Sequence, residues 1–326
     1  MTSPLEQLSA ALASDMDAVN AAILKHMDSP VALIPQLAGY LIAAGGKRIR
    51  PLLTLASTAI YGEDMARAHN LAAVVEFIHS ATLLHDDVVD ESTARRGQDS
   101  ANQVFGNSAS VLVGDFLFSR AFQVMVHDGS LDVLRVLSDA SAIIAQGEVM
   151  QLSTANNLET TLDDYIEVIK SKTAALFAAG CEVGPMIAGA DLAQTEAMAS
   201  YGMYLGIAFQ IADDALDYNA EGEALGKTVG DDFREGKMTA PVIYALESAS
   251  AEEHDFWERT IARREQQDGD LERALEIFTT HGCMDKTMAL AQDYVARAKE
   301  ALSAVPDHAL KSVLMEMAEY TVSRST

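Results

Sequence analysis

The chain has 326 residues, with 23 Lys and Arg against 48 Asp and Glu, and a formal net charge of −25. This balance excludes the basic surface that nucleic acid binding needs and disfavours polybasic attachment to anionic lipid. Hydrophobic residues make up 49% of the sequence, enough for a large buried core, and only two cysteines are present, without a CxxC motif, so neither a disulfide framework nor a cysteine zinc site is expected.

The first ten residues, MTSPLEQLSA, carry neither a basic segment nor an apolar core, so they predict no signal peptide. A membrane-spanning helix needs about 20 apolar residues. The long uncharged run at 29–46 contains prolines and glycines, and the one at 197–212 is too short. We therefore expect a cytoplasmic protein without a transmembrane segment.

Apolar residues recur at helical spacing along almost the whole chain, as at 64–90, and no stretch shows the alternation of a strand. Segment 197–212 is apolar all round and predicts a central helix. Segment 219–241 is polar and glycine-rich, which indicates a surface loop beside a site, while 250–305 predicts an outer amphipathic layer. Helix breaks are expected at Gly45-Gly46, Arg96-Gly97, Asp128-Gly129, Gly184-Pro185 and Pro306. Without a linker, the chain predicts one all-α domain over 1–326, a helical bundle.

Two segments, LLHDDVVD at 83–90 and FQIADDALD at 209–217, place aspartates at positions i, i+1 and i+4 after an apolar run. On a helix, residues i and i+4 lie one turn apart on the same face. One such motif alone is more often a solvated helix turn, but two copies favour metal binding. Mg²⁺ takes one or two carboxylates together with substrate phosphate oxygens. The candidate metal ligands are Asp86, Asp87, Asp90, Asp213, Asp214 and Asp217.

Basic residues in this acidic chain gather in short clusters. Segment 45–51, GGKRIRP, combines glycines with one lysine and two arginines, and Arg95-Arg96 follow the first aspartate motif. Taken singly, each cluster could be a set of surface salt bridges. Taken together with the aspartates, the basic clusters are better explained by a diphosphate that is held by metal on one side and by guanidinium groups on the other. His79 lies two helical turns before Asp86 and could add a phosphate contact, although a core histidine is the alternative.

The motifs GGKRIRP, FIHSATLLHDDVVDESTARRG, SKTAALF, FQIADDALDY and GKTVGDD occur in this order. Together they resemble the trans-isoprenyl (polyprenyl) diphosphate synthases, and most closely the long-chain octaprenyl and decaprenyl enzymes that make quinone side-chain precursors. The resemblance implies an isoprenoid-synthase-like bundle around a central cavity. It also implies a homodimer that condenses isopentenyl diphosphate with an allylic diphosphate. About three Mg²⁺ ions per active site are implied as cofactors.

The resemblance also implies a role for each matching residue. Asp86, Lys172, Asp90 and Asp213 would be catalytic. The allylic diphosphate would contact Arg95, Lys172, Thr173, Gln210 and Lys227. The diphosphate of isopentenyl diphosphate would contact Lys47, Arg50, His79 and Arg96. Lys237 and Arg324 would help to close the site, and peripheral contact with a membrane could release the product.

Product length is expected to depend on the residues just before the first aspartate motif. Thr82 lies about 40° and Ala81 about 140° from the direction of Asp86, so Thr82 faces and Ala81 flanks the tunnel along this helix. Both side chains are small, whereas relatives with short products carry bulky aromatics there. A deep tunnel is therefore expected, with Phe122 as a candidate for its floor, and the resemblance to the family implies octaprenyl to decaprenyl products.

Two other functions are alternatives to this one. A terpene cyclase also ionises a prenyl diphosphate with aspartates and Mg²⁺, but it needs no second diphosphate pocket, so GGKRIRP, His79 and the Arg95-Arg96 pair favour the transferase. A non-catalytic subunit of the same fold would be expected to lack some of these residues, and none is missing. For product length, a farnesyl or geranylgeranyl synthase is the alternative.

Overall fold

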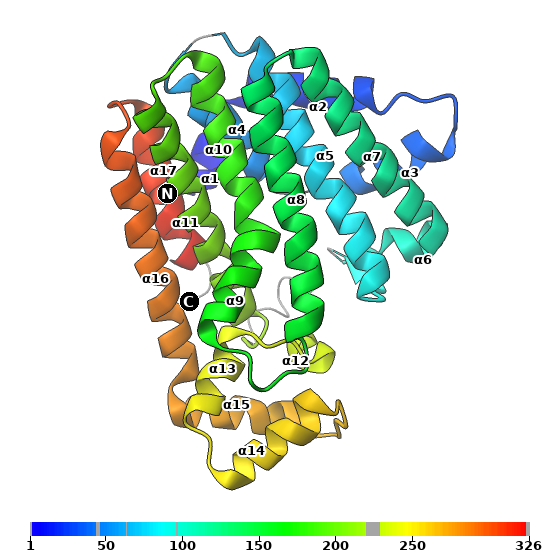
Figure 1. Ribbon diagram of the computed structural model, residues 1–326, viewed down its shortest axis with the longest axis vertical. Helices are drawn as coiled ribbons and strands as arrows, with labels where there is room; N and C mark the ends of the chain where they lie inside the picture. Colours follow the sequence, from blue (N-terminus) through cyan, green and yellow to red (C-terminus); the bar gives the residue numbers. More distant parts are fainter. Residues whose placement is uncertain (1, 44–45, 63, 96, 220–228, 324–326) are drawn as a thin grey trace. The chain divides into compact units, whose positions relative to one another are not determined.

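The structure, a computed structural model, describes residues 2–43, 46–62, 64–95, 97–219 and 229–323. Over these residues the chain is almost entirely α-helical (Figure 1), which confirms the predicted all-α class. Two short strands, β1 (Ala94–Arg95) and β2 (Gln98–Asp99), pair antiparallel beyond the first aspartate motif. The helices group into two compact units, and a single domain over 1–326 stays a prediction.

The first unit consists of Met1–Ser141, Leu176–Gly202 and Ala301–Leu314. Three helices, α8 (Leu131–Thr154), α11 (Leu192–Leu216) and α17 (Ala309–Ser323), are divided between the two units, and two more, α10 (Ala175–Ala188) and α16 (Cys283–Ala301), each extend into the other unit by one terminal residue. The other helices of the first unit are α1 (Pro4–Ala11), α2 (Ala13–His26), α3 (Leu33–Ala43), α4 (Ile49–Ala59), α5 (Ala66–Val89), α6 (Ala101–Phe105), α7 (Asn107–Asp128), α10 (Ala175–Ala188) and the 3₁₀ turn η4 (Leu302–Ala304).

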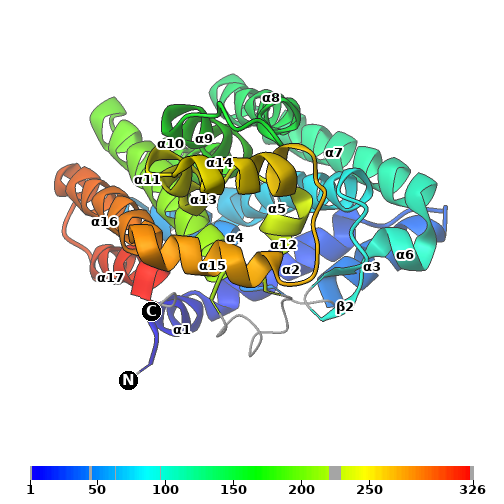
Figure 2. The same ribbon diagram turned by 90° about the horizontal axis from the view of Figure 1, so that it is seen from below.

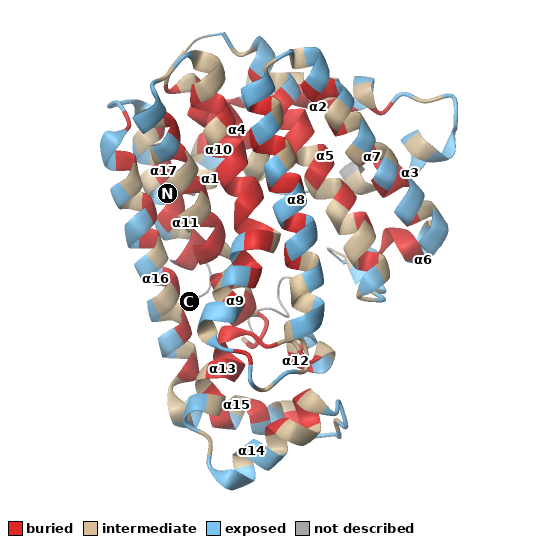
Figure 3. Cartoon of the chain, viewed as in Figure 1, coloured by how far each residue is buried: buried red, intermediate tan, exposed pale blue. Residues whose placement is uncertain are grey.

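Helix α5 is the central element of the first unit, because it packs against α7, α4 and α2. Helix α4 is buried at every position from Pro51 to Thr58, and α5 is buried without interruption from Leu71 to Val75 (Figure 3). This all-round burial follows from sequences that are apolar or small on every face. It fixes the end of α5, where the first aspartate motif lies.

The expected break at Gly184-Pro185 is wrong, because both residues lie inside α10. A Cβ atom on Gly184 would stand 2.1 Å from Ser57 Oγ and 2.7 Å from the backbone nitrogen of Thr58. The glycine therefore permits close approach of α10 to α4 rather than a turn. Pro185 lacks a backbone N–H and so removes one hydrogen bond from α10, which ends one turn later at Ala188. Gly129, by contrast, ends α7 with a φ of 79°, as predicted.

The second unit consists of Ala142–Ala175, Met203–Glu300 and Met315–Thr326. Its elements, besides the shared helices, are α9 (Leu162–Ile169), the π-helical turn η1 (Lys170–Ala174), α12 (Asp231–Glu235), α13 (Ala240–Glu247), α14 (Ala251–Trp257), the π-helical turn η3 (Glu258–Ala262), α15 (Asp270–His281) and α16 (Cys283–Ala301). Figure 2 shows α14 and α15 from below.

An aromatic cluster supports the segment after α11. The Trp257 ring stacks on Phe278 with centroids 5.7 Å apart, and Tyr218 meets Phe278 edge-on at 5.0 Å. Phe233 of α12 meets Trp257 at 6.4 Å. Within the described part of the predicted loop 219–241, the short helix α12 is thereby anchored to a buried core through Phe233. Residues 220–228 lie outside the described part of the chain.

Two other expectations concern whole helices. None of residues 197–212 in α11 is exposed, as predicted for a helix surrounded by others. Helix α7 is long and apolar enough to cross a membrane by length and composition, with 39% of that window buried. One such helix among the described residues is weak support for a membrane span, because core helices pass the same test.

Candidate active site

The first aspartate motif lies at the C-terminal end of α5. Asp86 and Asp87 occupy its last turn, and Asp90 is the C-cap, with its backbone N–H donating to the carbonyl of Asp86. Asp86 and Asp90 are partly exposed, whereas Asp87 is fully buried. The predicted one-turn spacing is thus realised, and it places two of the three carboxylates where solvent or a ligand can reach them.

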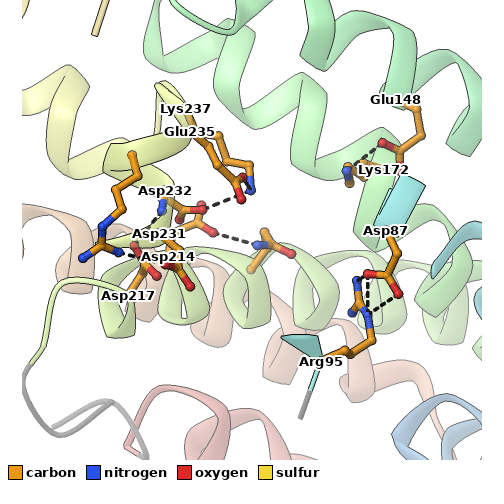
Figure 4. Close-up of polar contacts among 12 residues, drawn as sticks. Asp87, Arg95, Glu148, Lys172, Asp214, Asp217, Asp231, Asp232, Glu235 and Lys237 are labelled. Atoms are coloured by element: carbon orange, nitrogen blue, oxygen red, sulfur yellow. Dashed lines mark hydrogen bonds and ion pairs between the residues drawn. The ribbon is translucent and has the colours of Figure 1, made fainter. Parts of the chain in front are cut away.

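Asp87 is held by Arg95, which β1 brings back toward α5 (Figure 4). The guanidinium donates from Nη2 to Oδ1 at 2.7 Å and from Nε to both carboxylate oxygens at 2.9 and 3.1 Å. Asn102 Nδ2 donates to the Asp87 backbone carbonyl at 3.0 Å. Asp87 therefore anchors the turn after α5, and Arg95 is occupied by it in this state.

Carboxylates at the C-terminus of a helix stand at its negative pole, where cations are favoured and anions are not. The sequence places three there on α5 and two, Asp213 and Asp214, in the last turn of α11, with Asp217 directly after it. Arg95 neutralises one of them. The remaining repulsion is a cost to folding that a bound cation relieves, which makes both helix ends suited to divalent metal.

The predicted isopentenyl diphosphate residues gather around the N-terminus of α4. Arg50 Nη1 lies 3.2 Å from His79 Nε2, and its guanidinium lies over the Phe177 ring at 4.4 Å. Lys47 is exposed just before this helix, whose N-terminal N–H groups favour an anion. Arg48 pairs with Glu76 of α5 and adopts a φ of 46°. Its side chain therefore stabilises the segment before α4 and is not one of the predicted diphosphate contacts. Arg96 lies outside the described residues.

In the second unit, α11 carries the other aspartate motif. Asp214 is buried, and its oxygens accept hydrogen bonds from the Tyr165 hydroxyl at 2.6 Å and from Gln210 Nε2 at 2.7 Å. Burial raises the pKa of Asp214 well above its ordinary value, the charge of Asp232 raises it further, and the two hydrogen bonds oppose the rise. Asp213 is partly exposed.

In addition to any metal contact, Asp217 stabilises the backbone at the start of α12. Its carboxylate accepts a hydrogen bond from the backbone N–H of Asp232 at 3.0 Å, and its carbonyl accepts one from Gly230 at 2.8 Å. These contacts fix the start of α12. Lys237, two residues beyond α12, pairs with Asp232 at 3.3 Å and Glu235 at 2.5 Å (Figure 4).

Predicted allylic-diphosphate residues meet in one pocket of the second unit, with a volume of about 120 Å³. Its walls include Lys172 and Thr173 of η1, Gln210 and Asp214 of α11, and Lys237. Thr173 Oγ1 donates to Gln210 Oε1 at 2.9 Å. Residues far apart in the sequence thus line one small cavity, and Arg95 is not among them. Lys227 and Arg324 lie outside the described residues.

Sequence reasoning missed Glu148 of α8, whose Oε2 lies 2.6 Å from Lys172 Nζ (Figure 4). A Cβ atom on the preceding Gly147 would stand 2.6 Å from the backbone nitrogen of Lys172. Close packing of α8 on η1 therefore requires this glycine and brings the carboxylate to the lysine. The only signal in the sequence was a glycine next to a glutamate inside an apolar helix.

The residues present fit a hard divalent cation. The donors are all carboxylate oxygens, which Mg²⁺ prefers. Among the described residues, no group of three or more His, Cys, Asp or Glu side chains converges into a closed cage.

The predicted chain-length residues lie in the first unit. Ala81 is fully buried in α5, and Thr82 is partly buried, with its hydroxyl donating to the carbonyl of His79 at 2.9 Å. Phe122 of α7 lines a cavity of about 700 Å³, but neither Ala81 nor Thr82 does. Their shared role in a tunnel therefore stays a prediction.

Known proteins resemble this chain over almost its whole length. A family model described as polyprenyl synthetase matches residues 31–278. Octaprenyl diphosphate synthase of Escherichia coli (strain K12) is 45% identical, over 98% of this chain and 99% of its own. The crystal structure of a decaprenyl diphosphate synthase from Rhodobacter capsulatus matches with a TM-score of 0.95 and 51% identity, covering 99% of each chain. A polyprenyl synthase from Caulobacter crescentus CB15, complexed with calcium and isoprenyl diphosphate, matches with a TM-score of 0.95 and 49% identity, covering 99% of this chain and 98% of that one.

Proposed function

This chain belongs to the polyprenyl synthetase family, and from that premise we propose that it is a magnesium-dependent, long-chain trans-prenyltransferase. It joins isopentenyl diphosphate head-to-tail to an allylic diphosphate and repeats the step to an octaprenyl to decaprenyl product, the kind used for quinone side chains. The observation that carries the proposal is the pair of carboxylate-bearing helix C-termini, accompanied by basic residues in both units. Whole-length similarity to octaprenyl and decaprenyl synthases supports the long product.

Asp86 and Asp90 on α5 and Asp213 on α11 are the proposed magnesium ligands, because they are the partly exposed members of their motifs. Asp87, Asp214 and Asp217 are held by the hydrogen bonds described above and stabilise the helix ends that carry these ligands. Bound Mg²⁺, about three ions per active site, would neutralise the charge that develops on the leaving diphosphate. Calcium and isoprenyl diphosphate in the Caulobacter crescentus protein support a divalent metal here.

Lys172, Thr173 and Gln210 are the proposed allylic-diphosphate contacts that line the pocket of the second unit. Arg95, which lies in the first unit, and Lys227, which lies outside the described residues, are the further contacts that the family resemblance implies. Lys47, Arg50, His79 and Arg96 bind the diphosphate of isopentenyl diphosphate. Two separate basic sets are what a two-substrate condensation needs, whereas a terpene cyclase would need one. Arg50 suits this role because its guanidinium is held over the Phe177 ring and beside His79, which orders it before substrate binds.

The reaction follows from these contacts. The basic residues stabilise diphosphate as the allylic C–O bond breaks and leaves a resonance-stabilised carbocation. The double bond of isopentenyl diphosphate, held nearby by its own contacts, attacks that carbon. The new cation then loses a proton to the departing diphosphate, and the lengthened allylic product can react again. Water must be kept out, because it would quench the cation.

We further propose a cytoplasmic homodimer that touches a membrane only to release product. Helix α7 exposes Leu112 at 66% and Val126 at 64%, and large exposed apolar side chains on one helix favour a covered surface. Analytical ultracentrifugation tests the dimer. A monomer at micromolar concentration would contradict it.

The decisive experiment is incubation with Mg²⁺, labelled isopentenyl diphosphate and an allylic primer, followed by sizing of the dephosphorylated products. Octaprenyl to decaprenyl alcohols are expected. Farnesyl or geranylgeranyl products would move the enzyme to the short-chain class. Cyclic hydrocarbon formed from the primer alone would instead make it a terpene cyclase.

A further inference from the structure

Tyr165 lies on α9, outside every motif that the proposed function uses. Its ring is buried, it lines the pocket of the second unit, and its hydroxyl donates to Asp214 Oδ2 at 2.6 Å. Building on the proposed function, we infer that Tyr165 is a positioning residue for the allylic diphosphate pocket. Through Asp214 it fixes the side-chain amide of Gln210 so that this amide presents an N–H donor to the diphosphate.

The hydrogen bonds of this chain run in one direction in the structure. Asp214 Oδ1 accepts from Gln210 Nε2 at 2.7 Å, and Gln210 Oε1 accepts from the Thr173 hydroxyl at 2.9 Å. The nitrogen of the Gln210 amide thus faces Asp214, and its oxygen faces Thr173. The amide orientation, which is otherwise a choice between two flips, is thereby set by its neighbours.

This orientation has a consequence for an anionic substrate. The amide nitrogen carries two hydrogens, of which one is used by Asp214. The other has no protein acceptor among the described residues, and Gln210 lines the pocket. A diphosphate accepts hydrogen bonds and donates none at neutral pH. The flipped amide would present its oxygen to the diphosphate and repel it. Fixing the observed orientation of the amide therefore favours binding of the diphosphate.

Tyr165 is well placed to hold the carboxylate still. Helix α9 begins with a capping box between Thr161 and Asp164, and it buries Tyr165, Val168 and Ile169 on one face. The phenol therefore has a fixed position against α11. Removing its hydroxyl would leave Asp214 Oδ2 buried without this donor, and the carboxylate could turn away from Gln210.

The test compares Tyr165→Phe with Tyr201→Phe in the full-length protein. Tyr201 is also fully buried, and its hydroxyl makes one hydrogen bond, to the carbonyl of Leu314 at 2.8 Å, outside the pocket. Tyr165→Phe is expected to raise KM for the allylic diphosphate about tenfold, the size of one charge-assisted contact, with KM for isopentenyl diphosphate unchanged. Tyr201→Phe is expected to lower the unfolding temperature without changing either KM.

Binding gives a readout apart from turnover. Calorimetric titration with inorganic pyrophosphate and Mg²⁺ should show about tenfold weaker binding to Tyr165→Phe than to the wild type. When Gln210 is already replaced by alanine, adding Tyr165→Phe should cause no further loss of affinity, because Tyr165 acts through the Gln210 amide. Additive effects, or a Tyr165→Phe variant that loses only stability, would overturn the inference. If Tyr165→Phe does not fold, Gln210→Glu replaces it. An outward N–H predicts loss of pyrophosphate binding in Gln210→Glu, and unchanged binding contradicts it. Failure of the proposed function looks different, because the wild-type protein would then form no condensation product.

Discussion

Lys172 Nζ and Glu148 Oε2 lie 2.6 Å apart, and the glycine beside Glu148 makes this distance possible. Gly147 has no side chain where α8 meets η1, so the two backbones approach closely enough for the carboxylate to hold the lysine at the pocket. An ion pair that is partly buried, with 22% and 28% of its side chains exposed, restricts where the ammonium group can go.

Gly147→Ala should therefore damage both stability and substrate binding. The added methyl group would overlap the backbone of η1, and overpacking of this kind costs about 1–3 kcal/mol. KM for the allylic diphosphate should rise as Lys172 is displaced. Gly39→Ala is the matched control, because Gly39 is also inside a helix but meets nothing within 4 Å, so the change should be neutral or stabilising by up to about 1 kcal/mol. Chemical denaturation and steady-state kinetics check both variants, and a fully stable Gly147→Ala would contradict the packing argument.

The aspartates at the helix C-termini should lower the stability of the metal-free protein and should be needed for metal binding. In the presence of a chelator, Asp90→Asn should be more stable than the wild type by about 0.3–1 kcal/mol, because it removes a negative charge from the negative pole of α5. With Mg²⁺ present, the same variant should lose kcat by orders of magnitude, as should Asp86→Ala and Asp213→Ala. Asp132→Ala, an exposed aspartate in the first turn of α8, serves as control and should keep full activity. Activity of folded Asp86→Ala near the wild-type rate would reject the metal assignment.

The two basic sets should separate in kinetics. Arg50→Gln should mainly raise KM for isopentenyl diphosphate, and Lys172→Ala should mainly raise KM for the allylic substrate. Loss of a charge-assisted contact changes affinity about tenfold to a hundredfold. Initial rates measured against each substrate in turn give the four constants. Equal effects of both variants on both constants would show that the sets do not serve different substrates.

Product length should respond to Ala81. A phenylalanine at this buried position of α5 would narrow any tunnel along that helix, so Ala81→Phe is expected to stay active on a short primer but to release products of a few units. Ala72→Phe is a control at another fully buried position of α5, and it should lower stability without shortening the product. Chromatography of the dephosphorylated alcohols distinguishes them. An active Ala81→Phe enzyme with unchanged product length places the tunnel elsewhere.

Acid stability should depend on Asp270. The Arg259 guanidinium donates two hydrogen bonds of 2.7 Å to its carboxylate, and these lower the pKa of Asp270 below the ordinary value of 3.8. A carboxyl whose folded-state pKa is lowered stabilises the protein above its unfolded-state pKa, and this contribution is lost as the pH falls through the folded-state value. Asp270→Asn should thus be destabilised at neutral pH and should lose less stability between about pH 5 and the acid limit. Asp268→Asn, at an exposed position nearby, should follow the wild-type curve in urea titrations at several pH values.

Local sequence patterns were enough to predict the all-α fold class and the family. Helical periodicity is a local property, so the all-α prediction needed no tertiary information. The i, i+4 spacing of Asp86 and Asp90 likewise fixes their common face on any helix. Motif order predicted the family, because the motifs are short contiguous segments of sequence, and the family model confirms it.

Tertiary structure decided what those side chains do for one another. Asp86 and Asp87 are neighbours in sequence, yet only one is buried against Arg95, because the hairpin after α5 folds back on that side. The sequence predicts a helix break at Gly184, but in the structure this glycine is a site of close helix packing. Glu148 and Tyr165 lie outside every sequence motif. Their roles depend on which helix lies opposite, and that is set by burial of apolar faces across long stretches of chain, which local patterns do not encode.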